Sequence, residues 1–237
     1  MVFTSFNFLL FFPAVIVVYF LLPQKFRLVF LLIASYYFYI NIKPVYALLL
    51  AGITLTTYFF AILIGREKSE KKKKRLLIAD IIITLLPLFF FKYFNFVNEG
   101  VYTLLNYAGL HLPLPDITFL LPVGISFYTF MALGYIIDVY NEEVETEKNI
   151  GIVALFLSFF PVVMSGPIER ASNMFHQFRN KIEFNSAIVV KGLQMMLWGY
   201  FMKLALADRI SIYIDAVYKN AEQHVGSSLL LATLMQP

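Results

Sequence analysis

Long stretches without a charged residue constrain the fold of this chain more than any other feature of its sequence. Residues 117–137 carry no charge, and a helix of that length, rising about 1.5 Å per residue, crosses roughly the 30 Å of hydrocarbon in a bilayer. Further uncharged runs cover residues 1–24, 28–42, 44–65 and 149–168. Because an open strand edge beside lipid leaves backbone groups unbonded, these runs predict helices.

The composition is that of a polytopic membrane protein. Hydrophobic residues make up 60% of the chain and charged residues only 14%, with a mean hydropathy of +0.74. Shorter apolar runs at residues 81–91 and 192–202 bring the expected membrane-associated segments to about seven. The absence of cysteine excludes disulfides, thiolate metal sites and a cysteine nucleophile. We therefore predict an all-α polytopic membrane protein, with residues 1–237 forming a single membrane domain.

Charge is concentrated in one loop. Residues 66–75 hold seven basic and two acidic residues, whereas the whole chain has a net charge of only +4. The loop lies between two membrane segments and has no interleaved aromatic residues, so we expect no nucleic acid partner. The positive-inside bias places it in the cytoplasm, in contact with the bilayer. This predicts a multi-pass protein of the inner cell membrane with its N-terminus outside.

A polar stripe runs along residues 119–140. On a helical period one side carries Gly124, Tyr128, Met131, Tyr135 and Asp138, and the neighbouring rows carry Ser126 and Thr129. Asp138 near a helix C-terminus opposes the helix dipole and needs a partner or water. Two interpretations remain: the stripe lines a cavity, or its hydroxyls bond neighbouring helices while Gly124 and Gly134 allow close packing.

The chain after residue 90 does not follow the pattern of a simple bundle. Residues 91–116 are aromatic and contain prolines, which favours interfacial helices. The run 149–168 is broken by Pro161 and by Gly166 with Pro167, which indicates either a re-entrant segment beside a cavity or a helix that ends at the interface. Residues 172–191 have the spacing of an amphipathic interfacial helix. A further apolar segment is expected at residues 189–207.

Few residues suit acid–base chemistry. His111 and Asp116 have the H-x4-D spacing of glycerolipid acyltransferases, in which the carboxylate orients a histidine base. The prolines between them favour an extended segment, so a solvated interfacial loop is the alternative. His176 and His224 are expected at the surface. Asp80 can reach back toward the basic loop, which predicts an interfacial ion pair.

Three segments together resemble one family. They are LPVGISFYTFMALGYIIDVY from Leu121, SFFPVVMSGPIER from Ser158 and GLQMMLWGYFMKLALADRIS from Gly192. In this order they resemble the membrane-bound O-acyltransferase family, nearest to the branch with the alginate O-acetylation and teichoic-acid D-alanyl transfer proteins. The resemblance implies helices around a funnel, with interfacial and re-entrant segments. It also implies that the chain is the N-terminal part of a longer fold, whose catalytic histidine lies beyond Pro237.

The resemblance implies a reaction and its participants. An acetyl or short acyl group passes from a cytoplasmic thioester, acetyl-CoA or an acyl carrier protein, toward a hydroxyl of an extracytoplasmic polysaccharide. A periplasmic or surface acyltransferase is the expected partner, and no metal or bound cofactor is expected. Candidate channel residues are Gly124, Ser126, Tyr128, Thr129, Tyr135, Asp138, Gly166 and Pro167. Candidate donor-side basic residues are Arg170, Arg179 and Lys181. The alternatives are a transport or export component, or a non-catalytic part of a larger membrane enzyme.

Overall fold

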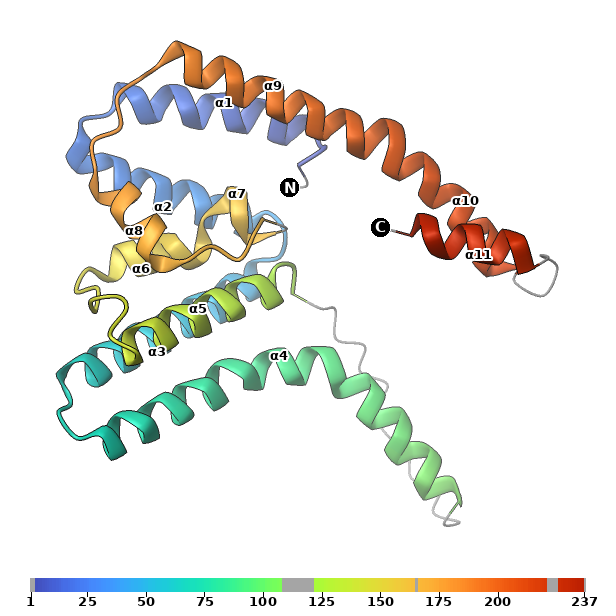
Figure 1. Cartoon of the computed structure of the whole chain (residues 1–237), viewed down its shortest axis with the longest axis horizontal. Coiled ribbons are helices and arrows are strands. Elements are labelled where there is room, and N and C mark those ends of the chain that lie inside the picture. The colour runs from blue at the N-terminus through green and yellow to red at the C-terminus, as the bar shows by residue number, and fades with distance from the viewer. Residues whose placement is uncertain (1–2, 108–121, 165, 221–225, 237) are drawn as a thin grey trace. The chain divides into compact units, whose positions relative to one another are not determined.

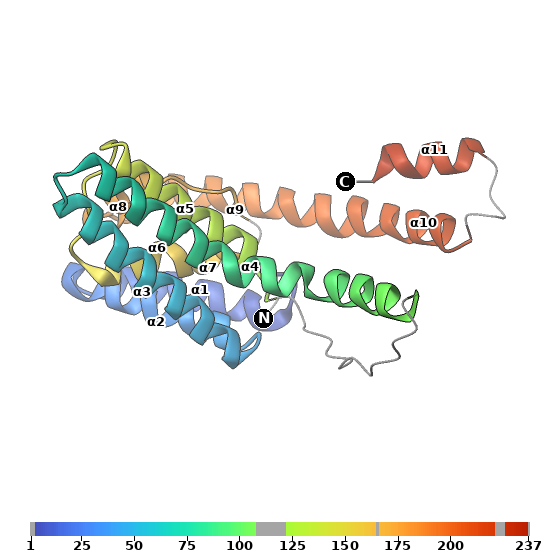
Figure 2. The ribbon, with the colours of Figure 1, turned by 90° about the horizontal axis from the view of Figure 1, so that it is seen from below.

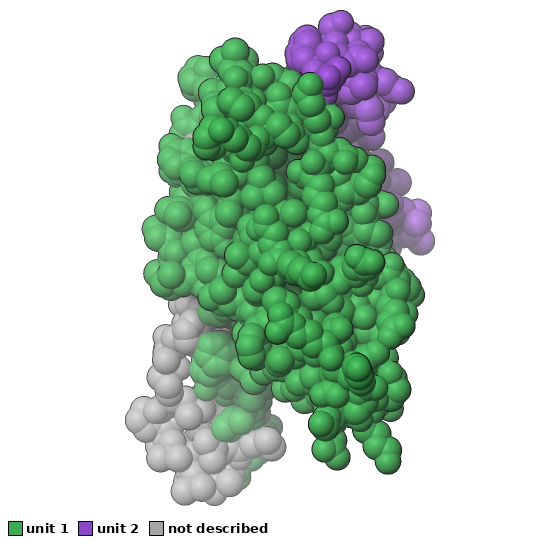
Figure 3. All heavy atoms as spheres, turned by 90° about the vertical axis from the view of Figure 1, so that its left-hand side faces the viewer, with its two compact units in different colours: residues 1–182 green, residues 183–237 purple. Residues whose placement is uncertain are grey.

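The computed structural model describes residues 3–107, 122–164, 166–220 and 226–236. Every regular element in these ranges is a helix (Figure 1). The chain divides into two compact units, Met1–Ile182 and Glu183–Pro237 (Figure 3). The prediction of an all-α polytopic membrane protein is confirmed.

The first three helices are α1 (Phe6–Leu21), α2 (Gln24–Ile40) and α3 (Pro44–Arg66). Ser5 caps α1 by accepting a hydrogen bond from the backbone N–H of Phe8 at 3.3 Å. Pro44 opens α3, at the position where its missing N–H costs nothing. α1 packs on α2 through aromatic rings, with the Phe8 and Phe38 centroids 6.0 Å apart.

The fourth helix, α4 (Glu70–Tyr107), is a single helix of 38 residues. The prediction of separate interfacial helices after residue 90 is therefore wrong as far as Tyr107, and residues 108–116 lie outside the described residues. Pro87 inside α4 removes one backbone donor without ending the helix. Aromatic pairs four residues apart continue past it, such as Phe89 with Tyr93, whose ring centroids are 4.7 Å apart.

Four helices complete the first unit: α5 (Ile125–Tyr140), α6 (Ile150–Ser158), α7 (Phe160–Val163) and α8 (Ala171–Arg179). The predicted break in the run 149–168 is confirmed, because the chain leaves helical geometry at Phe159 and again after α7. The predicted amphipathic helix over residues 172–191 is wrong in its extent. It ends at Arg179, and an extended backbone at Asn180 turns the chain away.

Two helices are long and apolar enough to span a membrane: Pro44–Arg66 and the Glu70–Phe94 part of α4. Shorter apolar helices are Phe6–Leu21, Ile125–Tyr140, Ile150–Val163 and Gly226–Met235. In the first unit α3, α4 and α5 pack against one another, and α2 packs on α3 and α6 (Figures 1 and 2). The largest hydrophobic cluster lies in this group and includes Leu50, Ile64 and Met131.

The second unit contains α9 (Ser186–Phe201), the π-helical turn η1 (Met202–Ala207), α10 (Asp208–Lys219) and α11 (Gly226–Met235). Asn185 caps α9 through hydrogen bonds from two backbone N–H groups. Lys203 and Asp208 form an ion pair at 2.7 Å within this helical run. α10 packs on α11 through Ile214, Val217 and Ala232.

Candidate functional site

The polar stripe of α5 lies largely in the protein core. Tyr128, Thr129, Tyr135 and Asp138 are buried, and Ser126 is half-buried. The hydroxyls of Tyr128 and Thr129 have no hydrogen-bond partner among the described residues. The three described cavities are lined by residues other than these five. Their assignment to a channel wall therefore stays a prediction.

Gly124, just before α5, and Gly166, after α7, each lie close to the backbone of α7. Gly124 has a φ of 77°, and a Cβ there would lie 2.1 Å from the carbonyl oxygen of Val163 in α7. A Cβ on Gly166 would lie 2.7 Å from the Cα of Val162. The close approach predicted at Gly124 is confirmed. The one predicted at Gly134 is wrong, because a Cβ at that position meets nothing within 4 Å.

Asp138 has the partner that the helix dipole requires. Its Oδ1 accepts a hydrogen bond from Nη1 of Arg170 at 2.5 Å, which joins the C-terminal turn of α5 to the residue before α8. The Asp138 side chain is 4% exposed, whereas the Arg170 side chain is 64% exposed. The pair therefore neutralises a buried carboxylate and leaves much of a guanidinium at the surface.

A second ion pair repeats this arrangement at the other end of α8. Arg179 donates from Nη2 to Oε2 of Glu147, whose side chain is buried. Glu147 is held further by its Oε1, which accepts from the Asn149 N–H at 2.8 Å. Its own N–H donates to the Tyr135 hydroxyl at 3.0 Å. Nothing in the sequence distinguishes Glu147 from the other acidic residues of this polar loop.

The two ion pairs attach α8 to α5 and to the loop that follows it. Between them Phe175 packs its ring edge-on to Tyr135, with centroids 5.2 Å apart, and Met174 is also buried. The predicted donor-side residues Arg170 and Arg179 thus lie at the two ends of one short helix. Lys181 and Pro167 are exposed and lie outside that helix. Partly exposed guanidinium groups in this setting can bind phosphate oxygens.

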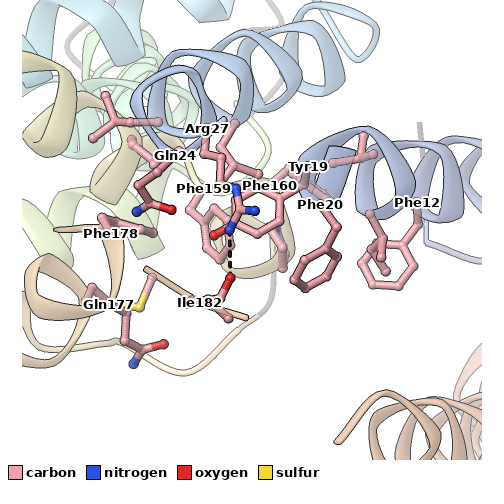
Figure 4. Close-up of a pocket in the computed structure, with 17 residues that line it drawn as sticks. Phe12, Tyr19, Phe20, Gln24, Arg27, Phe159, Phe160, Gln177, Phe178 and Ile182 are labelled. Carbon is pink, nitrogen blue, oxygen red and sulfur yellow. Dashed lines mark hydrogen bonds between the residues drawn. The ribbon is translucent and has the colours of Figure 1, made fainter. Parts of the chain in front are cut away.

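A mostly apolar cavity of about 290 Å³ opens beside α1, α2 and the chain from α6 to Ile182 (Figure 4). Arg27 is the charged residue of its lining. Its Nη1 donates to the Ile182 carbonyl at 2.7 Å, and its guanidinium lies 4.8 Å from the ring centroid of Tyr19. The helical spacing of Phe12, Val15 and Tyr19 is the sequence signal that could have pointed to this cavity.

The histidines do not form a described site. His111 and Asp116 lie outside the described residues, as does His224. His176 is exposed on α8, where its ring is hydrogen-bonded to the Asn180 side chain. Asp80 departs from its predicted ion pair with the basic loop. It is fully buried, because α4 is helical throughout and turns this position toward α3 and α5.

The loop after α5 is tethered by a surface ion pair, which leads to a pH prediction. Lys73 donates to Oε1 of Glu142 at 2.7 Å, and this contact lowers the pKa of the Glu142 carboxyl. A lowered folded-state pKa adds stability above the ordinary glutamate pKa of about 4.3 and loses it as pH falls. Amide exchange in residues 141–148 should therefore quicken, beyond its intrinsic pH dependence, as the pH falls from about 5 to below 4.

The control for this tether is Glu142→Gln, which removes the charge. The variant should exchange faster at pH 7 and respond less to acidification. Equal protection in the two proteins at pH 7 would show that the ion pair does not hold the loop.

Comparison with curated proteins finds similar chains. The probable alginate O-acetylase of Pseudomonas putida is 32% identical over 232 residues, covering 97% of this chain and 47% of the relative. That of Pseudomonas aeruginosa is also 32% identical, covering 97% and 44%. The peptidoglycan O-acetyltransferase of Helicobacter pylori is 28% identical over 219 residues, covering 81% and 40%. The chain thus spans just under half the length of these relatives. No family model matches the chain, and no solved structure matches it significantly.

Proposed function

The chain belongs to the membrane-bound O-acyltransferase family, in the branch of the alginate O-acetylases, and from this premise we propose that it takes part in O-acyl transfer to a polysaccharide. The group transferred is an acetyl or other short acyl group. It comes from a cytoplasmic thioester, acetyl-CoA or an acyl carrier protein, and goes to a hydroxyl outside the membrane. A periplasmic or surface acyltransferase is the proposed partner.

The observation that carries this proposal is the pair of arginines at the ends of α8. Arg170 and Arg179 each pair with a buried carboxylate and keep more than half of their side chain exposed. A thioester donor of this kind carries phosphate groups, and guanidinium is well suited to bind them. The proposed orientation puts α8 on the cytoplasmic side with the basic loop of residues 66–75, in the inner cell membrane with the N-terminus outside.

In the proposed reaction, residues of this chain bind the donor and line the path of the acyl group, and a general base removes the acceptor proton. In O-acyl transfer the acceptor hydroxyl attacks the thioester carbonyl, the thiolate leaves, and the hydroxyl proton passes to a general base. We assign donor binding to Arg170, Arg179 and Lys181, and the path of the acyl group to the α5 stripe and to Gly166 and Pro167. The exposed His176 is not assigned as the base. The base is proposed to belong to a region that the relatives have beyond the matched part, so residues 1–237 alone are expected to be inactive.

The proposal is tested in the organism that makes the protein. Deleting the gene should remove base-labile acetate esters from a surface polysaccharide, and restoring the gene should return them. Unchanged ester content after deletion would contradict the proposal. A transport component is the alternative, and it predicts solute flux in vesicles that carry the protein. Acyl transfer without such flux would exclude it.

Arg170→Lys tests the donor site in the restored strain. Lysine keeps the positive charge beside Asp138 but loses the planar fork that binds two phosphate oxygens. Loss of one charge-assisted hydrogen bond should raise the donor KM by about tenfold, with little change in kcat. The measurement is acetyl transfer in isolated membranes over a range of donor concentrations.

Arg75→Gln is the matched control, because Arg75 is an exposed arginine in the basic loop. It should leave the donor KM unchanged. Equal KM values for Arg170→Lys and the unaltered protein would remove Arg170 from the donor site.

A further inference from the structure

The core formed by α3, α4 and α5 contains a carboxylate without a counter-charge. Asp80 in α4 is fully buried. No hydrogen bond of normal geometry joins either carboxylate oxygen to a described residue, and the polar neighbour of Asp80 is the hydroxyl of Thr84, one turn further along α4. Asp80 also forms none of the described ion pairs, although Arg75 of the basic loop lies only five residues earlier in the sequence. An ionised carboxylate in such surroundings is strongly unfavourable unless a positive charge accompanies it.

Three threonine hydroxyls in the same group of helices are also buried without a hydrogen-bond partner among the described residues. Thr57 in α3, Thr84 in α4 and Thr129 in α5 are buried, and their Oγ1 atoms have no partner among the described residues. Threonines in helices usually bond a carbonyl of the preceding turn. Thr54 and Thr56 of α3 do so, with Oγ1 distances of 2.8 Å to Leu50 and 2.9 Å to Ile53. The three unbonded hydroxyls are therefore exceptions within their own fold.

Asp80 and two of the unbonded hydroxyls lie at similar depth in the three helices, and Thr84 lies one turn further along α4 than Asp80. Thr57 lies nine residues before the end of α3 at Arg66, Asp80 ten residues after the start of α4 at Glu70, and Thr129 eleven residues before the end of α5 at Tyr140. At about 1.5 Å per residue these positions are roughly 14 to 17 Å from the helix ends. Those ends are joined by contacts between Lys73 and Glu142 and between Thr146 and Ala61.

Helix phase gives the direction of three of these side chains. Asp80 and Thr84 are four residues apart, so they lie on the same face of α4. Thr129 precedes Asp138 by nine residues, which at about 100° per residue is half a turn. Since Asp138 faces Arg170 beside α8, Thr129 faces away from α8. Because α5 packs on α3 and α4, that direction leads to these helices.

The chemistry of this group suits one kind of ligand. A carboxylate and three hydroxyls are hard oxygen donors, which bind alkali and alkaline-earth cations rather than soft metals. One negative charge balances one positive charge. A divalent ion would need more carboxylates or several waters, and the buried apolar surroundings offer neither. The hydroxyl oxygens supply lone pairs to a cation, which explains why they are not bonded to the backbone.

We propose that Asp80, Thr57, Thr84 and Thr129 form a binding site for one monovalent cation of the sodium class between α3, α4 and α5. The cation neutralises Asp80 and holds three helices together through one centre. The proposal does not depend on the transfer reaction, since none of its evidence comes from the α8 arginines. Evidence against the cation site would therefore not count against the proposed function.

The test measures thermal unfolding of the purified full chain in detergent by circular dichroism at constant ionic strength. Replacing choline chloride by sodium chloride should raise the unfolding temperature saturably, by roughly 5 °C once the site is filled. Bound sodium-22 should saturate near one ion per chain. An unfolding temperature that is the same in choline, potassium and sodium would overturn the proposal, and so would a protein that responds only to pH, since Asp80 is then neutralised by a proton.

Two variants and a control place the effect at the site. Asp80→Asn should abolish both the sodium-dependent rise and sodium-22 binding. Thr57→Val keeps the shape of the side chain and should weaken sodium binding at least tenfold, which decides the matter if Asp80→Asn does not fold. Thr56→Val is the control, because its hydroxyl bonds its own helix, and it should respond to sodium as the unaltered protein does. A full sodium response in Thr57→Val and Asp80→Asn would refute the site.

Discussion

Replacing Arg179 with alanine is expected to lower the free energy of unfolding by about 2–4 kcal/mol, because it leaves Glu147 as a buried carboxylate without a counter-charge. The Glu147 side chain is only 4% exposed, so water cannot take over from the guanidinium. The Asn149 N–H donates to the Glu147 carboxylate and keeps it from turning outward, while the backbone N–H of Glu147 donates to the Tyr135 hydroxyl. Chemical denaturation of the purified protein in detergent measures this loss.

Substitution of the other partner in the ion pair is the matched control. Glu147→Gln leaves the charge of Arg179 unpaired, but that side chain is 57% exposed and water can solvate it. The amide also retains an acceptor for the Asn149 N–H. The loss should therefore be about 1 kcal/mol or less. Equal losses in the two variants, or a larger loss in Glu147→Gln, would show that burial of the carboxylate does not dominate this contact.

Gly124→Val is expected to have the second large effect, a loss of about 3 kcal/mol or more in the free energy of unfolding. A φ of 77° is strained for any residue with a Cβ and most strained for a β-branched one. A Cβ at this position would also stand 2.1 Å from the Val163 carbonyl oxygen, a backbone atom that cannot swing aside. Either α5 begins later, or α7 moves away from it.

Gly134→Ala provides the comparison within the same helix. A Cβ at Gly134 meets nothing within 4 Å, and its backbone is helical. Alanine should be neutral or stabilising by up to about 1 kcal/mol. Both variants are measured by chemical denaturation, with proteolysis at residues 159–170 reporting any displacement of α7. A Gly124→Val protein as stable as Gly134→Ala would contradict the close contact.

Hydrophobic pattern was sufficient to predict the class of fold and several of its elements. The uncharged runs at residues 1–24, 28–42 and 44–65 contain the helices α1, α2 and α3. The run at residues 117–137 was predicted to cross a bilayer, but its described part is helical only from Ile125, so that α5 is a shorter helix of 16 residues. The prolines and glycine after residue 160 did mark the break in the run 149–168. Local geometry also predicted that Asp138 needs a partner, since the dipole argument depends only on its place in α5. The identity of that partner did not follow, because Arg170 comes near only after the chain has passed through α6 and α7.

The other differences between the sequence-based predictions and the structure arise from contacts between residues that are far apart in the sequence. Glu147 looks like its acidic neighbours until Arg179 and Tyr135 are brought against it. Asp80 is close enough in sequence to reach the basic loop, but the phase of α4 turns it into the core. The aromatic residues and prolines of residues 91–116 predicted separate interfacial helices, whereas pairs of rings four residues apart are compatible with one long helix to Tyr107.

The length of α4 has a consequence for how this helix can lie at a membrane. A helix of 38 residues is about 57 Å long at 1.5 Å per residue, nearly twice the hydrocarbon thickness of a bilayer. The part of α4 that is long and apolar enough to span a membrane is Glu70–Phe94, and about 20 Å of helix follows it. A helix of this length cannot stand upright within the hydrocarbon, so α4 must tilt, kink at Pro87 or extend past the bilayer.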